Sequence, residues 1–359
     1  MKKALFVWLM LSLVVPLFVS CTSPSEVDTS TIYAGGYTVN SALAYVPGYW
    51  KNGTWLGLTN PYGASYDAQV LSLVVAGSDV YAGGYCTNGP GVWVAGYWKN
   101  SNWVELTNSY GSYNAQVYSL VVVGSVVYAG GYCHDGTGTF VAGYWVNGVW
   151  AGLTNTYGAS CSAQVTSLIF DGTYLYAAGY SNKSSGVSVA GYWKNGTWVG
   201  LTNTFGSSYS AVATSLVLNG PDVYVGGYSY NSSGVFFAGY WMNGTWIALN
   251  NTAGSFSARV TSLVAGSDVY AGGYIYNSSG LSAPGYWKNG TWVGLTNSYG
   301  SSNGAVNSLV LAGSNVYAGG YSSIVGAVAC YWKDGSWVGL SDTHSGNNCG
   351  VNALVVVSQ

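Results

Sequence analysis

Residues 49–55 read Tyr-Trp-Lys-Asn-Gly-Thr-Trp, and close variants of this heptapeptide recur along the 359-residue chain. Its two tryptophans are always five positions apart. The dipeptide Asn52-Gly53 lies between them, and Asn-Gly favours a two-residue turn because both residues must adopt positive φ. The heptapeptide therefore predicts a tight β-hairpin in which Trp50 faces Trp55. The seven pairs are Trp50/Trp55, Trp98/Trp103, Trp145/Trp150, Trp193/Trp198, Trp241/Trp246, Trp287/Trp292 and Trp332/Trp337.

The turn dipeptide is Asn-Gly or Asp-Gly in six of the seven copies. The second copy lacks the glycine, and there we place Ser101-Asn102 in the turn. The same hairpin is expected in every copy.

Two further marks share the period of the Trp pairs. Tyr-Ala-Gly-Gly-Tyr, first seen at 33–37, returns every 46 to 48 residues, and so does a β-branched run such as 164–169. Each period thus holds four short strands separated by turn residues. We call them strand A (the Ser-Leu-Val run), strand B (Tyr-Ala-Gly-Gly-Tyr), strand C (Ala-Gly-Tyr-Trp) and strand D (Thr-Trp-Val-Gly-Leu). No repeat shows a helical period.

Four-stranded repeats of this length are typical of β-propeller blades. The first repeat begins at strand B near Ile32, and the last residues, 350–359, supply a strand A with no B, C or D after it. Joining the two ends completes a seventh blade and removes exposed sheet edges. The sequence therefore predicts an all-β fold, a seven-bladed β-propeller over residues 32–359. The alternative is a linear β-solenoid with a frayed last repeat.

The repeat resembles the kelch motif. Gly35-Gly36 followed by Tyr49 and Trp55 shows the resemblance, and later repeats carry versions of it over residues 32–359. The resemblance implies a kelch-like propeller that acts as an interaction scaffold. Some kelch-like propellers are copper radical oxidases, which need paired histidines. The only two histidines here, His134 and His344, are far apart, so no cofactor is expected.

The N-terminus reads as an export signal. Lys2 and Lys3 precede an apolar core at 4–19, so residues 1–20 are interpreted as a signal peptide. Phe18 to Cys21 resembles a bacterial lipobox, which implies lipidation of Cys21 with fatty acids such as palmitate. Residues 21–31 would then form a polar tether. The resemblance implies an exported protein anchored to the cell envelope, at the outer membrane or cell surface. A plain secretory signal is the alternative.

Charge is scarce in this chain. Asp, Glu, Lys and Arg make up 6% of residues, against about 25% in ordinary soluble domains. The few basic residues are spread over the whole sequence, which excludes a phosphate-neutralising surface and therefore nucleic-acid binding. The surface must consist mainly of Ser, Thr, Asn, Gly and Tyr. Antibody paratopes use this set of residues for recognition.

The loops between strand D and the next strand A carry the candidate binding residues. Strand alternation places these D–A loops on the same rim as the B–C loops, and strand A lies nearest the axis of a propeller. Aromatic rings beside amides suit a glycan or a protein loop. The alternative is that the rings pack neighbouring blades together. Arg259 could hold an acidic group at the channel, and the alternative for it is a solvated charge. The candidates are Tyr62, Tyr66, Tyr110, Tyr113, Tyr157, Tyr209, Gln69, Gln116, Gln164 and Arg259.

Catalytic and metal sites find little support. Glycoside hydrolysis needs two carboxylates at a set separation, and the only glutamates are Glu26 and Glu105. Cys133-His134-Asp135 offers ligand types for a metal, but three adjacent loop residues seldom converge on one ion. We therefore expect a binding or scaffold protein, with a structural envelope-assembly role as the alternative and an enzyme as a distant third.

The cysteines after Cys21 do not recur in every repeat, so they form no disulfide framework. A disulfide between Cys133 and Cys161 is possible in an oxidising compartment, and the pairing stays open. These cysteines are Cys86, Cys133, Cys161, Cys330 and Cys349.

Overall fold

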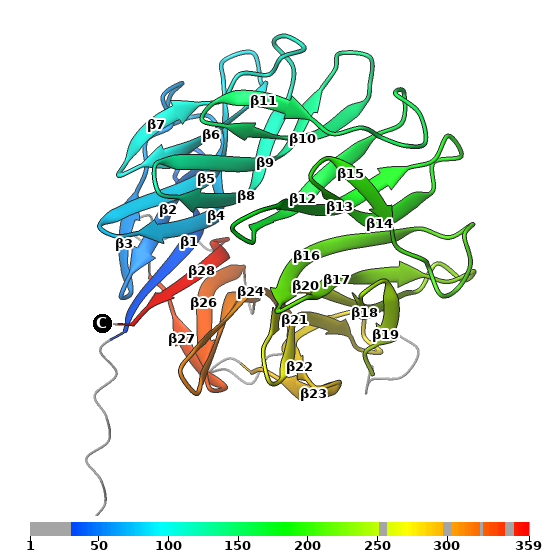
Figure 1. Ribbon diagram of the computed structural model, residues 1–359. Helices are drawn as coiled ribbons and strands as arrows, with labels where there is room; N and C mark the ends of the chain where they lie inside the picture. The colour runs from blue at the N-terminus through cyan, green and yellow to red at the C-terminus, as the bar shows by residue number, and fades with distance from the viewer. Residues whose placement is uncertain (1–29, 251–256, 297–302, 324–325, 342–347, 359) are drawn as a thin grey trace, which may run out of the picture.

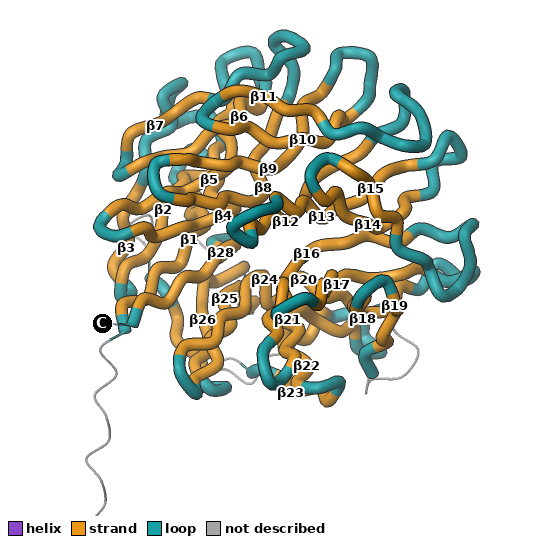
Figure 2. Tube along the Cα trace, viewed as in Figure 1, coloured by secondary structure: helices purple, strands orange, loops and turns teal. Residues whose placement is uncertain are grey.

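The computed structural model describes residues 30–250, 257–296, 303–323, 326–341 and 348–358. This part of the chain forms seven four-stranded antiparallel sheets arranged in a ring (Figures 1 and 2), which confirms the predicted seven-bladed propeller. No helix in the described ranges is long and apolar enough to cross a membrane. The predicted signal peptide, Cys21 and most of the tether lie outside the described residues.

We number the blades from the one that contains the N-terminal strands, and give their strands from the axis outwards in the order A, B, C, D. Blade 1 contains β28 (Gly350–Val357), β1 (Thr31–Val39), β2 (Tyr45–Lys51) and β3 (Thr54–Gly57), and blade 2 contains β4 (Ala68–Ala76), β5 (Asp79–Thr87), β6 (Trp93–Lys99) and β7 (Asn102–Glu105). Blade 3 contains β8 (Ala115–Val123), β9 (Val126–His134), β10 (Phe140–Val146) and β11 (Val149–Gly152), blade 4 contains β12 (Ala163–Phe170), β13 (Leu175–Asn182), β14 (Ser188–Lys194) and β15 (Thr197–Gly200), and blade 5 contains β16 (Ala211–Asn219), β17 (Asp222–Tyr230), β18 (Phe236–Met242) and β19 (Thr245–Ala248). Blade 6 contains β20 (Ala258–Ala265), β21 (Val269–Tyr276), β22 (Ser282–Lys288) and β23 (Thr291–Gly294), and blade 7 contains β24 (Asn303–Ala312), β25 (Asn315–Ser323), β26 (Ala327–Lys333) and β27 (Ser336–Gly339).

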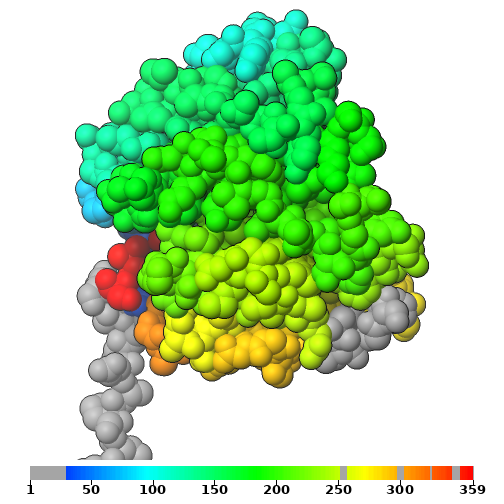
Figure 3. Space-filling model, turned by 45° about the vertical axis from the view of Figure 1, so that its right-hand side comes forward, coloured from blue at the N-terminus to red at the C-terminus, as the bar shows by residue number. Residues whose placement is uncertain are grey.

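The two ends of the chain close the ring. Strand β28 pairs antiparallel with β1, and Figure 1 shows the red C-terminal strand beside the blue N-terminal one. Each strand A also contacts the strand A of the next blade, including β28 with β4. In the space-filling view of Figure 3, the red C-terminal segment lies at the left edge of the molecule, against its body. The composite blade is therefore confirmed, and the linear solenoid is wrong.

The C–D hairpins have the predicted turn. Asn52 and Gly53 have φ of 48° and 82°, and Trp50 pairs with Trp55 across the hairpin. The Asn52 Oδ1 also accepts the N–H of Ile32 at 2.8 Å, which ties the turn to strand B. In the second copy the turn residues are Asn100 and Ser101, with φ of 47° and 73°. The predicted Ser101-Asn102 turn is wrong, because Asn100 keeps the left-handed position and its side-chain bond to strand B.

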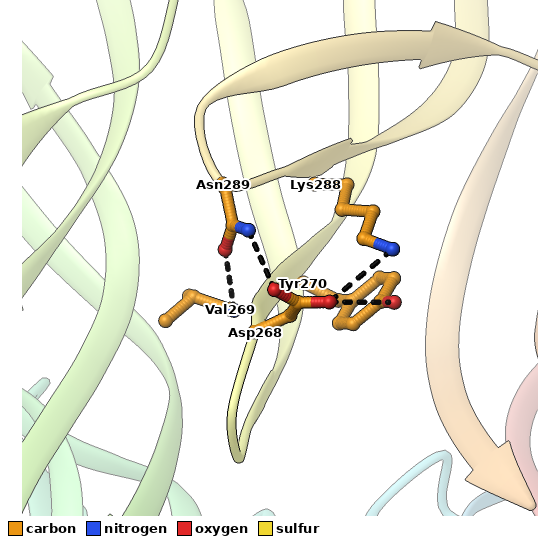
Figure 4. A network of polar contacts seen from close by, with 5 residues as sticks. All are labelled: Asp268, Val269, Tyr270, Lys288 and Asn289. Atoms are coloured by element: carbon orange, nitrogen blue, oxygen red, sulfur yellow. Dashed lines mark hydrogen bonds and ion pairs between the residues drawn. The ribbon is translucent and has the colours of Figure 1, made fainter. Parts of the chain in front are cut away.

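Aspartates at the A–B turns, on the other rim, brace these hairpins. In Figure 4 the Asn289 Nδ2 donates to Asp268 Oδ1 at 2.7 Å, while its Oδ1 accepts the Val269 N–H at 2.9 Å. The Lys288 Nζ lies 3.2 Å from Asp268 Oδ2 and 5.2 Å from the centre of the Tyr270 ring. Hydrogen bonds from Asn289 and Lys288 lower the pKa of Asp268. These aspartates are structural, as their position in turns suggests.

The first tryptophan of each pair joins neighbouring blades. Its ring is fully buried, and its Nε1 donates to a carbonyl at the start of the D–A loop that leaves the preceding blade. In blade 4, for example, Trp193 Nε1 lies 3.0 Å from Thr154 O. The same bond in the other blades is Trp50–Ser341, Trp98–Thr59, Trp145–Thr107, Trp241–Thr202, Trp287–Asn250 and Trp332–Thr296. The repeated Trp is thus both core and tether, which explains why it recurs in every repeat.

A β-bulge in strand A supplies a second set of bonds between blades. In blade 3 the bulge brings Ser119 Oγ to the Leu168 N–H of blade 4 at 2.9 Å. Six of the seven blade junctions have this Ser–Leu bond. At the junction of β28 with β4 the serine position is Ala353, but Asn352 Nδ2 donates to Val70 O at 2.8 Å, as Asn307 Nδ2 does to Val351 O at the preceding junction. The closing junction therefore keeps a polar bond.

Candidate functional site

The D–A and B–C loops lie on one rim, as predicted, and asparagines hold them together. The Asn60 Oδ1 accepts the Tyr62 N–H at 3.0 Å, and its Nδ2 donates to Tyr66 O at 3.0 Å and Thr87 O at 3.4 Å. Asn108, Asn155 and Asn203 repeat this arrangement in the next three loops. The rim is therefore built from ordered loops that can position side chains.

Three equivalent hollows, which we call rim pockets, open on this rim over blades 2, 3 and 4. Their volumes are about 520, 520 and 270 Å³. In each pocket the floor is the end of strand D, and the two walls are the D–A loops that enter and leave the blade. The pocket over blade 2 has Tyr62 on its entering loop, Tyr113 on its leaving loop and Glu105 in its floor. Over blade 3 these positions are Tyr110, Cys161 and Gly152, and over blade 4 they are Tyr157, Tyr209 and Gly200.

The pocket over blade 2 contains an internal hydrogen bond. Tyr62 Oη donates to Glu105 Oε2 at 2.6 Å, and its ring packs against the hydrophobic core. Burial, followed by this bond, raises the pKa of Tyr62. For Tyr62 the alternative interpretation, packing between blades, therefore describes the structure.

The pockets over blades 3 and 4 have glycine where blade 2 has Glu105. A Cβ placed on Gly152 would lie 3.4 Å from Trp150 Nε1 and 3.9 Å from Tyr110 Oη. On Gly200 the distances are 3.2 Å to Trp198 Nε1 and 3.7 Å to Tyr157 Oη. Both indole nitrogens are buried and have no acceptor, as is also the case for Trp103 in blade 2 and Trp246 in blade 5. An indole N–H and a tyrosine hydroxyl, which can donate or accept, thus lie close to one point of the pocket floor in each blade.

Blade 5 shows how the pocket is closed. The ring of Phe205, which takes the place of Tyr157, lies 4.8 Å from the ring of Phe237, with the two planes tilted by 40°. Blades 2, 3 and 4 carry valine at the position of Phe237. An aromatic pair thus stands where the pocket would open.

The second aromatics of the D–A loops stand between the rim pockets and the axis. Tyr113 is 45% exposed and lies over the B–C loop of its blade, 5.9 Å from the His134 ring. Tyr209 lines both the rim pocket of blade 4 and a hollow nearer the axis. Tyr66 is partly buried, with its Oη near Gly89. The structure therefore brings Tyr113 and Tyr209 to pockets and sets Tyr66 against its own B–C loop.

The channel mouth is lined by tyrosines that the sequence analysis did not select. They are the second Tyr of each strand B, and each hydroxyl interacts electrostatically with that of a neighbouring blade. Burial raises the pKa of all seven, for Tyr37 and Tyr274 to about 12. The ring is Tyr37, Tyr85, Tyr132, Tyr180, Tyr228, Tyr274 and Tyr321. Their shared place at the end of strand B was the available signal.

The predicted strand A residues lie directly beside this ring. The register pairs each of them with the ring tyrosine of its own blade, so that they form an inner set at the channel mouth. The pairs are Gln69–Tyr85, Gln116–Tyr132, Gln164–Tyr180 and Arg259–Tyr274. The candidate residues therefore divide between outer rim pockets and the inner channel mouth instead of forming one site.

The cysteines of the loop rim do not pair. Cys133 is buried, Cys161 lies in the wall of a rim pocket, and both are free thiols. Burial raises the pKa of the Cys133 thiol. Neither the proposed disulfide nor a grouping of three metal-ligating side chains occurs within the described residues. The Asp135 carboxylate instead accepts bonds from Thr137 and Thr139 in its own loop.

The sequence matches no protein-family model and no curated protein. Among solved structures, the chain is similar to AofleA of Arthrobotrys oligospora, with 12% identity, a TM-score of 0.41, and coverage of 73% of this chain and 84% of that one. A lectin of Aleuria aurantia, solved with Fucalpha1-6GlcNAc, has 12% identity and a TM-score of 0.41, covering 75% and 95%. That lectin is described as a six-bladed β-propeller, whereas the present chain has seven blades. Similarity this distant does not bear on the ligand of this chain.

Proposed function

We propose that this protein is a glycan-binding propeller that presents its rim pockets as separate sites. The observation that carries the proposal is the unpaired indole N–H that lies, with a tyrosine hydroxyl, close to Gly152 and again close to Gly200. A buried donor without an acceptor costs about 1–3 kcal/mol. An oxygen of a bound sugar, seated on the glycine, would satisfy it.

The rest of each pocket suits the same ligand. Tyr110 and Tyr157 offer ring faces to the C–H groups of a sugar. Asn155 and Asn203 also line the pockets, and their amides, bonded within the D–A loops, fix the shape of the pocket walls. Pockets of this composition, mostly apolar with a few placed polar groups, are typical of small-ligand sites. Two similar sites on one rim would raise the affinity for a multivalent glycan by effective concentration.

The first test is a binding experiment on the pockets of blades 3 and 4. Replacing both Tyr110 and Tyr157 with Ala should lower the affinity for a neutral glycan, identified on an array, at least about ten-fold, since a ring face and a hydroxyl are lost at each site. Isothermal titration calorimetry measures the change.

Phe205→Ala is the matched control, because it changes the equivalent loop position where an aromatic pair occupies the pocket. It should leave the affinity unchanged. Equal binding by wild type and the double variant would contradict the proposal. A protein that binds no glycan and cross-links to envelope proteins in cells would support the alternative, a structural role in envelope assembly.

We also propose that the propeller is kelch-like, and that it is lipid-anchored through Cys21 to the outer membrane or cell surface. Residues 1–31 support the anchor, and Gly35-Gly36 with Tyr49 and Trp55 support the kelch-like repeat. Cells that express the protein should incorporate labelled palmitate into it, and Cys21→Ser should abolish the labelling while the protein is still exported. Unchanged labelling of Cys21→Ser would contradict the anchor.

Binding rather than catalysis is proposed because the carboxylates that line the rim pockets, Glu105 and Asp135, are hydrogen-bonded within the protein. Glu105 is bonded by Tyr62, and Asp135 is held within its own loop. Turnover of a bound glycan by the purified protein would contradict this part of the proposal.

A further inference from the structure

Arg259 occupies the channel mouth at the junction of blades 5 and 6. Its guanidinium carbon lies 4.3 Å from the centre of the Tyr228 ring, 5.2 Å from Phe236 and 5.9 Å from Tyr274. Tyr230 and Tyr276 extend this aromatic cluster. Cation–π contacts hold the guanidinium in one place. Arg259 is therefore an enclosed cation rather than the freely solvated charge considered from the sequence.

The enclosed guanidinium has no carboxylate partner among the described residues. The Arg259 Nε is buried and lacks an acceptor. The ion pairs of the described chain are Lys99–Asp79 and Lys288–Asp268, both at the opposite rim. The sequences of residues 251–256 and 297–302 contain no Asp or Glu. A partly desolvated cation without a counter-charge is costly, and an anion that supplies one removes that cost.

The blades provide an internal comparison for this position. Blades 2, 3 and 4 carry the neutral amides Gln69, Gln116 and Gln164 there, and blade 5 carries Val212. Beside the short side chain of Val212 lies a hollow of about 470 Å³. Its other lining residues are Tyr180, Ser188, Ser208, Tyr209, Ser210, Tyr228 and Tyr230. This hollow shares Tyr228 with the Arg259 site, and its lining of hydroxyls and rings suits a neutral sugar unit.

We propose that Arg259 binds the carboxylate of an acidic sugar, such as a uronic acid, at the channel mouth. The planar guanidinium can donate two parallel hydrogen bonds to a carboxylate, a geometry that neutral amides cannot reproduce. A neutral sugar unit next to the acidic one would lie in the hollow across Tyr228. The choice of a sugar as the carrier of the carboxylate rests on the proposed function, whereas the anion site does not.

The test compares two oligosaccharides that differ in a single group. A glucuronate-terminated oligosaccharide and its carboxyl-reduced, glucose-terminated counterpart are titrated calorimetrically into the full-length protein. The acidic ligand should bind at least about ten-fold more tightly, because a charge-assisted bond exceeds 1.4 kcal/mol. The preference should disappear in Arg259→Gln and persist in part in Arg259→Lys.

Arg259→Gln is a suitable variant because three blades of this chain already carry glutamine at that position. Its melting temperature should match that of the wild type, and it should still bind neutral glycans at the rim pockets. The Tyr110/Tyr157 double variant should do the reverse, so failure of one proposal is distinguishable from failure of the other. Equal affinity of wild type and Arg259→Gln for the acidic ligand would overturn the proposal. So would an Arg259-dependent response to a peptide C-terminal carboxylate with none to the acidic sugar.

Discussion

Deletion of residues 350–359 should abolish the folded monomer. The deletion removes β28, which is the axial strand of blade 1 and pairs with β1 along its length. It also removes Val351 and Leu354, whose buried side chains each contribute about 1.5–3 kcal/mol. The free edge of β1 would then be open to pairing with other chains. We expect aggregation, or loss of a cooperative urea transition, measured by light scattering and tryptophan fluorescence.

A synthetic peptide of residues 350–359, added to the truncated protein, provides the control. It should restore a monomer with a cooperative transition, because the strand needs only its place in the ring and not its covalent link. The same peptide with Val351 and Leu354 changed to Ser should fail to rescue. A truncated chain that remains monomeric with an unchanged urea midpoint would show that the ring does not need closure by β28.

Gly320→Ala should lower the free energy of unfolding by about 3–5 kcal/mol. Gly320 lies opposite the bulge of strand A, and a Cβ there would overlap the carbonyl oxygen of Ala305. Backbone atoms cannot move aside without breaking the bulge that brings Ser308 to the Leu354 N–H. All seven repeats keep this glycine: Gly36, Gly84, Gly131, Gly179, Gly227, Gly273 and Gly320.

The neighbouring Gly319→Ala is the matched control. A Cβ on Gly319 would meet side-chain atoms, 3.0 Å from Val351 Cγ1 and 3.3 Å from Leu354 Cβ, and these can shift. Blade 4 already carries Ala178 at the equivalent position. The cost should stay within about 1 kcal/mol. Equal urea midpoints for the two variants would refute the role assigned to the bulge.

The local features of the fold were predictable because short-range chemistry specifies them. Asn52-Gly53 requires positive φ, and the structure has it. The error at Ser101-Asn102 arose from giving weight to the missing glycine. Asn100 alone keeps the turn, because its side chain bonds strand B at Val80. A turn of this kind is therefore recognised by the asparagine whose side chain bonds strand B as well as by the glycine that adopts positive φ easily.

The rim on which the candidate residues lie was predictable, but which of those residues line open pockets was not. The loop aromatics do line the rim, yet Tyr62 is bonded by Glu105 whereas Tyr110 faces Gly152. That difference depends on a residue 42 or 43 positions further along the chain, on the next blade. Sequence spacing within one repeat carries no information about it.

By itself, the sequence determined the number of blades, the hairpins and the closure by the two ends, because period and turn chemistry act within a single repeat. Only the tertiary structure decided which contacts cross from blade to blade. It made Trp193 a donor to Thr154, gathered the strand B tyrosines into one ring, and enclosed Arg259 among the rings of Tyr228 and Phe236. Those contacts depend on the distance between residues of different blades, and that distance is set only when the ring closes.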